Sequence, residues 1–173
     1  WAEDAINYVV GEGLFNGTSE TTFSPNGSMT RAMFVTVLGR MSGADPKAYT
    51  KSSFSDVSLD SYYGGYVEWA SANGIVTGVG EGKFAPDRAV TREQMAKMLL
   101  DYYNYLKKGT EGSWAIQLKY TDLAQVSDWA VDGVMFCTLK ELITGYSDGT
   151  FRPKNTATRA EVATILMRVS QAK

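Results

Sequence analysis

Three stretches of the chain carry apolar residues at the same helical spacing. Within each stretch they recur at i, i+3, i+4 and i+7, which predicts a helix with one apolar stripe. The three sets are Phe34, Val37, Leu38 and Met41; Met95, Met98, Leu99 and Tyr102; and Val162, Ile165, Leu166 and Val169. A single helix cannot bury such a stripe alone. The pattern therefore predicts an all-α fold in which each stretch contributes one helix to a central three-helix bundle with pseudo-threefold symmetry.

The residues before these helices repeat as well. Each helix is preceded by a Thr-Arg pair, which follows a Phe-x-Pro segment, a glycine and an aromatic residue at fixed distances. The aromatic residue lies 29 positions before the threonine in every copy, so no gap is needed inside the unit. The aligned residues are Trp1, Gly17, Phe23, Pro25, Thr30 and Arg31; Tyr62, Gly78, Phe84, Pro86, Thr91 and Arg92; and Trp129, Gly145, Phe151, Pro153, Thr158 and Arg159.

The offsets between copies place the repeat boundaries. The threonines are 61 residues apart (91−30) and then 67 residues apart (158−91), so the extra six residues lie within 106–117, a segment with linker composition. We expect three helix-loop-helix repeats, at 1–50, 51–117 (including the linker) and 118–173. The first helix of each repeat is expected near its aromatic residue. Ser55-Asp56 and Ser127-Asp128 are expected to supply N-caps in the later copies.

Composition excludes several classes of protein. The net charge of −2 does not indicate a nucleic-acid-binding surface, and no apolar run approaches the length of about 20 residues needed for membrane insertion. The absence of histidine removes the usual general base and most zinc sites. No pair of carboxylates recurs with the repeat, as a glycosidase would require. We therefore expect no enzymatic activity, no metal and no cofactor, and we expect Cys137 to be a small buried side chain.

The Thr-Arg pairs have two physical interpretations. Threonine at the start of a helix is an N-cap, and Thr91 with Gln94 and Thr158 with Glu161 have the spacing of capping boxes, so these residues and Thr30 are expected to be structural. Arginine in the first turn faces the positive end of the helix dipole and needs an anion nearby. That anion is either an internal carboxylate or, as the threefold repetition favours, a bound ligand carboxylate held by Arg31, Arg92 and Arg159.

Two further sets of repeated residues are candidates for a binding site. Trp1, Tyr62 and Trp129 are each followed seven residues later by a second ring, which favours core packing for most of these rings. The first ring of each pair has the alternative of packing against a sugar at a groove edge. Gly17, Gly78 and Gly145 either adopt positive φ in a turn or allow a ligand to approach the backbone closely.

These motifs resemble the S-layer homology domain, a cell-wall-anchoring module usually found in three tandem copies. The second repeat carries Phe54-Ser55-Asp56-Val57, Gly74-Ile75, Gly78, Gly82-Lys83-Phe84-Ala85-Pro86 and Thr91-Arg92-Glu93-Gln94. The third carries Tyr120-Thr121-Asp122-Leu123, Gly145, Gly149-Thr150-Phe151-Arg152-Pro153 and Thr158-Arg159-Ala160-Glu161. The family glutamate is present as Glu161, but Met33 and Gln94 stand at the equivalent positions, and Glu93 replaces the family alanine.

The resemblance implies a secreted protein at the bacterial cell surface. Its ligand would be a secondary cell-wall polysaccharide linked to peptidoglycan, with a terminal pyruvylated N-acetylmannosamine bound in grooves between repeats. Alternatives are a protein-protein or self-assembly module of an S-layer, and a peptidoglycan tether for an outer membrane. Because the fourth motif residue differs between copies, we expect unequal grooves. The third copy is the first place to look for the anion, since it has Arg152, Lys154 and Arg159 close in sequence.

Overall fold

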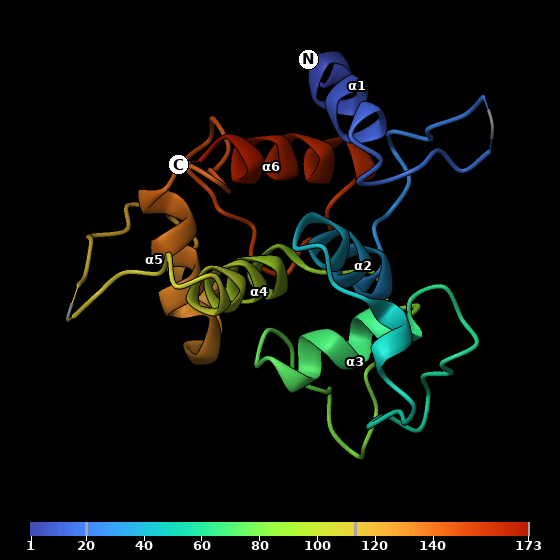
Figure 1. Ribbon diagram of the computed structural model, residues 1–173. Coiled ribbons are helices and arrows are strands. Elements are labelled where there is room, and N and C mark those ends of the chain that lie inside the picture. The colour runs from blue at the N-terminus through green and yellow to red at the C-terminus, as the bar shows by residue number, and fades with distance from the viewer. Residues whose placement is uncertain (20, 113, 173) are drawn as a thin grey trace.

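The computed structural model describes residues 1–19, 21–112 and 114–172, so Ser113 of the expected linker lies outside the described residues. Six α-helices are present in this part, and it contains no β-strand (Figure 1). The helices are α1 (Glu3–Gly11), α2 (Arg31–Met41), α3 (Gly64–Ala72), α4 (Arg92–Tyr105), α5 (Val131–Leu139) and α6 (Arg159–Gln171). Short 3-10 helices occupy Pro46–Ala48, Leu123–Gln125 and Asp128–Ala130. The all-α class is confirmed.

The second helix of each repeat begins at the arginine of its Thr-Arg pair. The Thr91 hydroxyl oxygen accepts a hydrogen bond from the N–H of Gln94, and the Gln94 side chain accepts one from the N–H of Thr91. Thr158 and Glu161 form the same capping box at α6. Thr30 also caps α2, but Met33 cannot return a side-chain bond. Three helices thus begin at equivalent residues because their caps are encoded locally.

Helix packing joins neighbouring repeats. The closest helix pairs are α2 with α3, α4 with α5, and α6 with α1, so each second helix packs on the first helix of the next repeat (Figure 1). At the α4–α5 contact, a Cβ on Gly133 would lie 2.7 Å from the backbone of Ala96. The Sγ of buried Cys137 lies 3.7 Å from the Ala96 carbonyl oxygen. The central three-helix bundle with threefold symmetry stays a prediction.

Backbone hydrogen bonds run in the same direction from repeat to repeat. The N–H of Arg31 donates to the Arg88 carbonyl at 2.9 Å, and the N–H of Arg92 donates to the Asn155 carbonyl at 2.9 Å. The N–H of Arg159 donates to the Gly27 carbonyl at 2.8 Å, which joins the third repeat to the first. One continuous core contains residues of all three repeats, including the equivalent and fully buried Leu38, Leu99 and Leu166. The repeats therefore fold as one unit.

The expected N-caps of the first helices are wrong. The residues preceding α1, α3 and α5 are Ala2, Tyr63 and Ala130, and none makes a side-chain cap bond. Asp56 instead accepts hydrogen bonds from the N–H groups of Phe84 and Ala85, both at 2.8 Å. Burial raises the pKa of the Asp56 carboxyl, but these bonds outweigh that effect and leave the pKa below its usual value. Asp122 makes the same clamp on Phe151 and Arg152.

The segment expected to be a linker lies between α4 and α5. The helix α4 ends at Tyr105, and no helix lies among the described residues of the expected linker at 106–117. Trp114 packs edge-on against Phe136 of α5, with ring centroids 6.2 Å apart. The segment therefore covers part of the core. The boundaries at 50 and 117 stay predictions.

Candidate functional site

Each repeated arginine is buried and reaches into the loop of the next repeat. Arg31, Arg92 and Arg159 are only 3%, 4% and 5% exposed. The Nε of each donates to the carbonyl of the phenylalanine in the neighbouring Phe-x-Pro segment. The distances are 2.9 Å from Arg31 to Phe84, 2.8 Å from Arg92 to Phe151 and 2.8 Å from Arg159 to Phe23. The guanidinium group also lies over the ring of that phenylalanine, 4.6 to 5.0 Å from its centroid.

A second nitrogen of each guanidinium group holds the glycine loop. Nη2 donates to the carbonyl of the residue before the repeated glycine. The distances are 3.2 Å to Thr77 from Arg31, 2.7 Å to Thr144 from Arg92 and 2.6 Å to Asn16 from Arg159. None of the three ion pairs among the described residues involves these arginines. The internal salt bridge is therefore contradicted, and backbone carbonyls take its place.

The repeated glycines are required by packing inside the loop. None of the three adopts positive φ, so the expected positive-φ turn is wrong. A Cβ at Gly17 would lie 2.5 Å from the Thr22 carbonyl oxygen, and one at Gly78 would lie 2.6 Å from the Lys83 carbonyl oxygen. At Gly145 a Cβ would meet the Tyr120 ring at 2.5 Å. The loop closes on itself too tightly for any side chain at this position.

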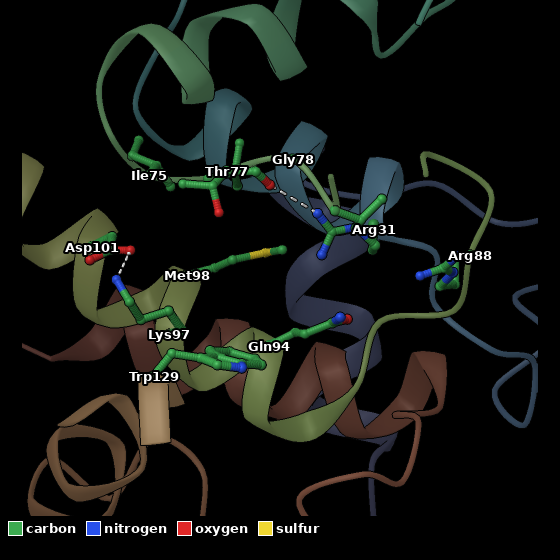
Figure 2. Close-up of a pocket in the computed structure, with 12 residues that line it drawn as sticks. Arg31, Ile75, Thr77, Gly78, Arg88, Gln94, Lys97, Met98, Asp101 and Trp129 are labelled. Carbon is green, nitrogen blue, oxygen red and sulfur yellow. Dashed lines mark hydrogen bonds and ion pairs between the residues drawn. The ribbon is translucent and has the colours of Figure 1, made fainter. Parts of the chain in front are cut away.

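The first of two equivalent cavities, the Trp129 groove, has a volume of about 490 Å³. Arg31 of the first repeat, Gly78 and α4 of the second, and Trp129 of the third all line it (Figure 2). The remaining charged lining residues are Arg88, Lys97 and Asp101. Lys97 and Asp101 form an ion pair one helical turn apart. Three repeats thus contribute one predicted site residue each to a single groove.

The second cavity, the Tyr62 groove, is lined by the equivalent residues, with the arginine supplied by the third repeat instead of the first. Its volume is about 340 Å³, and it is lined by Arg159 of the third repeat, Gly17 and α2 of the first, and Tyr62 of the second. Its charged lining residues are Arg40 and Arg159, and no acidic side chain lines it among the described residues. Six of the nine predicted binding residues therefore lie in these two grooves.

The third set of predicted residues is arranged differently, at what we term the Arg92 site. The guanidinium group of Arg92 lies 4.7 Å from the centroid of the Tyr146 ring, and the Tyr146 hydroxyl donates to Oε1 of Glu161 at 3.0 Å. Burial lowers the pKa of Arg92, while Tyr146 and Glu161 oppose that shift. This arginine therefore has an acidic side chain of the protein nearby. Val79 and Thr18 stand at the position of Tyr146 in the other repeats.

Core packing holds for the second ring of each aromatic pair and not for the first, so it applies to three of the six rings. Trp69 and Phe136 are buried in the core, and Tyr8 packs against it. Trp129 and Tyr62 are more than half exposed and line their grooves. Trp1 is 91% exposed, and neither groove includes it.

Burial lowers the pKa of both groove arginines. Burial and the positive charge of Arg88 together lower the pKa of Arg31 to about 10, although the Asp56 carboxylate opposes this shift. Burial also lowers the pKa of Arg159, and Tyr62 is the neighbour that opposes this shift. An anion in either groove would be attracted to a partly desolvated guanidinium group, where electrostatic interactions are stronger than in water.

The other cations of the third copy are occupied elsewhere. Arg152 pairs with Asp148 at 3.0 Å, and Lys154 pairs with buried Glu93 at 2.6 Å. Neither lines the two grooves. The idea that Arg152, Lys154 and Arg159 form one anion site is therefore wrong, and only Arg159 lies in a groove.

Sequence reasoning missed three groove-related residues. Arg88 and Arg40 line the grooves but do not recur in all three repeats, so the repeat gave no signal for them. The carboxylate of Glu93 accepts hydrogen bonds from the N–H and hydroxyl of Ser127, two residues before Trp129. The sequence signal for Glu93 was that it replaces the alanine found at this position in the family. Among the described residues there is no cluster of acidic and cysteine side chains suited to a metal ion.

The S-layer homology domain matches three segments of the chain, residues 1–33, 53–96 and 119–163, which together make up most of it. The chain belongs to the S-layer homology family. An S-layer protein of Bacillus thuringiensis subsp. finitimus is 26% identical over 99% of the chain, and a cellulosome-anchoring protein of Acetivibrio thermocellus is 27% identical over 84% of it. An endoglucanase of Bacillus sp. (strain KSM-635) is 37% identical over 96% of the chain.

The chain spans only part of these relatives. It covers 17% of the endoglucanase, 20% of the S-layer protein and 33% of the cellulosome-anchoring protein. The similarity to the endoglucanase therefore concerns the repeat module. Family membership and these relatives indicate a cell-surface module with an anchoring role. In the described part of the chain no helix is sufficiently long and apolar to cross a membrane.

Proposed function

We propose that the module anchors its protein non-covalently to the bacterial cell wall by binding a secondary cell-wall polysaccharide in the grooves between repeats. The ligand is a terminal N-acetylmannosamine that carries a pyruvate ketal and therefore a carboxylate. The observation that carries the proposal is the composition of the two grooves. Each combines a buried arginine, a tight glycine loop and an exposed aromatic ring from three different repeats.

Each part of a groove suits one part of an acidic sugar. The arginine side chain is fixed by two carbonyl bonds, so its remaining N–H groups are pre-oriented toward an anion. The indole of Trp129 and the phenol ring of Tyr62 offer flat apolar faces to the C–H groups of a sugar ring. Polar backbone in the glycine loop offers hydrogen-bonding groups to hydroxyls. The same grooves make a weaker case for a protein partner, since both are concave and positively charged.

Purified wall sacculi test the proposal. We expect the module to co-sediment with intact sacculi and to remain in solution after the secondary polysaccharide has been removed. Co-sedimentation that persists on stripped sacculi would favour peptidoglycan binding, including a tether for an outer membrane. Concentration-dependent self-association without sacculi would favour the self-assembly alternative.

A titration with two synthetic sugars tests the role of the carboxylate. Pyruvylated N-acetylmannosamine should bind, and the same sugar without pyruvate should bind at least tenfold more weakly, because it lacks the charge-assisted bond to arginine. Equal affinities would remove the carboxylate from the proposal.

A further inference from the structure

Building on the proposed function, we infer that the two grooves select different acidic glycans. The Trp129 groove takes a sugar with one carboxylate, which Arg31 and Arg88 hold together at one end of the groove. The Tyr62 groove takes a glycan unit with two anionic groups, which Arg159 and Arg40 hold at separate points. The residues that set this difference are Arg88 in the first groove and Arg40 in the second.

In the Trp129 groove the unpaired cations lie together. Figure 2 shows Arg31 and Arg88 on one side of the cavity, with Trp129 and Met98 between them and the Lys97–Asp101 pair. Burial lowers the pKa of Arg31 most, Arg88 also lowers it, and Asp56 opposes them less strongly, which agrees with the position of Arg88 on this side of the groove. Two guanidinium groups on the same side of the groove suit a single carboxylate, since each can donate to one of its two oxygens.

The opposite side of the Trp129 groove is suited to neutral groups. Lys97 and Asp101 neutralise each other there through their ion pair. The Asp101 side chain is still 20% exposed and can accept hydrogen bonds from sugar hydroxyls or from an N-acetyl N–H. A second acidic group on the ligand would be repelled by this carboxylate.

Among the described residues, the Tyr62 groove lacks both the second arginine at one end and the acidic side chain at the other. Gly27 stands at the position of Arg88, so Arg159 has no equivalent of Arg88 at its end of the groove. Arg40 stands at the position of Asp101, in the last turn of α2, and brings positive charge to the other end. Burial, Tyr63 and Asp87 raise the pKa of Tyr62, and the positive charges of Arg40 and Arg159 oppose this shift. Arg159 is the first residue of α6, and the two arginines bind different carbonyl groups, those of Leu14 and Asn16. Tyr62 therefore shares the groove with two cations from different helices, Arg40 of α2 and Arg159 of α6.

Arg40 has a structural role that can be separated from ligand binding. Its Nη1 donates to the Leu14 carbonyl at 3.3 Å. The equivalent Arg168 donates to the Leu142 carbonyl at the same distance, and Arg168 lines neither groove. The chain therefore contains a matched pair of arginines with the same backbone bond, of which one faces a groove.

The test is an NMR titration of the intact module with two probes. One is the methyl glycoside of pyruvylated N-acetylmannosamine, and the other is the same sugar carrying an added phosphate group. The backbone N–H signals of Gly78 and Gly17 report the two grooves separately. We expect the sugar with one carboxylate to shift the Gly78 signal at a lower concentration than the Gly17 signal, and the phosphorylated sugar to do the reverse. Each preference should be about tenfold, the size expected for one charge-assisted hydrogen bond.

Three variants assign the preference to side chains. Arg40→Gln should weaken diacid binding at the Gly17 signal about tenfold, whereas Arg168→Gln, which loses the same carbonyl bond, should leave it unchanged. Arg88→Asn copies the third repeat's Asn155 and should weaken monoacid binding at Gly78 alone. All three should keep the melting temperature close enough to the parent for the spectra to be compared.

Two results separate this inference from the proposed function. If both grooves bind both probes with the same preference, or if Arg168→Gln matches Arg40→Gln, the inference is overturned while polysaccharide binding stands. If neither probe shifts either signal and sacculi are not bound, the proposed function itself fails.

Discussion

Nη2 of Arg159 donates a hydrogen bond of 2.6 Å to the backbone carbonyl of Asn16, a residue 143 positions earlier in the chain. The bond joins the last repeat to the first and holds the glycine loop that lines the Tyr62 groove. The same side chain therefore both builds the groove and faces it. Repeated arginines in this module cannot be removed without structural cost, contrary to the simple expectation for ligand-binding side chains.

Replacing Arg159 by alanine should lower both stability and binding. The buried Arg159 side chain donates to the partly buried carbonyl groups of Phe23 and Asn16, and losing this charged donor costs about 2–4 kcal/mol of unfolding free energy. Urea unfolding monitored by circular dichroism measures the loss. Arg168→Ala is the control and should cost less, because it removes one bond at 3.3 Å. An unchanged midpoint for Arg159→Ala would contradict the structural role.

Gly78→Ala should destabilise the module through a clash inside its own loop. The added methyl group would lie 2.6 Å from the Lys83 carbonyl oxygen and 2.9 Å from the Phe54 ring. Overpacking of this kind costs about 1–3 kcal/mol. Gly11→Ala is a matched control, because a Cβ there meets nothing within 4 Å, and it should stabilise the end of α1 by about 0.5–1 kcal/mol. Thermal melting should give a lower melting temperature for Gly78→Ala and a higher one for Gly11→Ala.

Glu93→Ala should loosen the edge of the Trp129 groove. The substitution restores the residue found at positions 32 and 160, but it removes the bonds to Ser127 and the ion pair with Lys154. We expect a loss of about 1–3 kcal/mol in unfolding free energy and a change in the fluorescence of Trp129. Lys154→Ala should cost less, because Lys154 is 53% exposed and exposed ion pairs contribute little. Equal effects of the two variants would mean that the Ser127 bonds contribute nothing.

The Arg92 site should become a third binding site when its own acid is removed. Tyr146→Val copies the second repeat's Val79, and Glu161→Gln copies Gln94, which still forms a capping box. Without the Tyr146–Glu161 bond, Arg92 lacks a nearby carboxylate. Isothermal titration calorimetry with an acidic sugar should give two sites per parent chain and three in the double variant. A third site in the parent protein would show that Glu161 does not exclude ligand.

Local features of the sequence were sufficient for much of the fold. The second helices begin where Thr91 and Thr158 predict, because a cap and its partner three residues later interact within one turn. The first helices were placed less well. Asp56 was expected to cap a helix nearby, but it binds N–H groups 28 and 29 residues away, a contact with no signal in local spacing.

The sequence by itself determined the helical class, the threefold repetition and the family, because these depend on periodic patterns and fixed spacing. It also selected six of the residues that line the two grooves. Only the tertiary structure decided that each arginine binds carbonyls of the following repeat, since donors and acceptors come from segments 46 to 143 residues apart. It also decided which of the charged residues line a groove. A residue such as Arg40, Asp101 or Tyr146 acquires its role from the neighbours that packing brings to it.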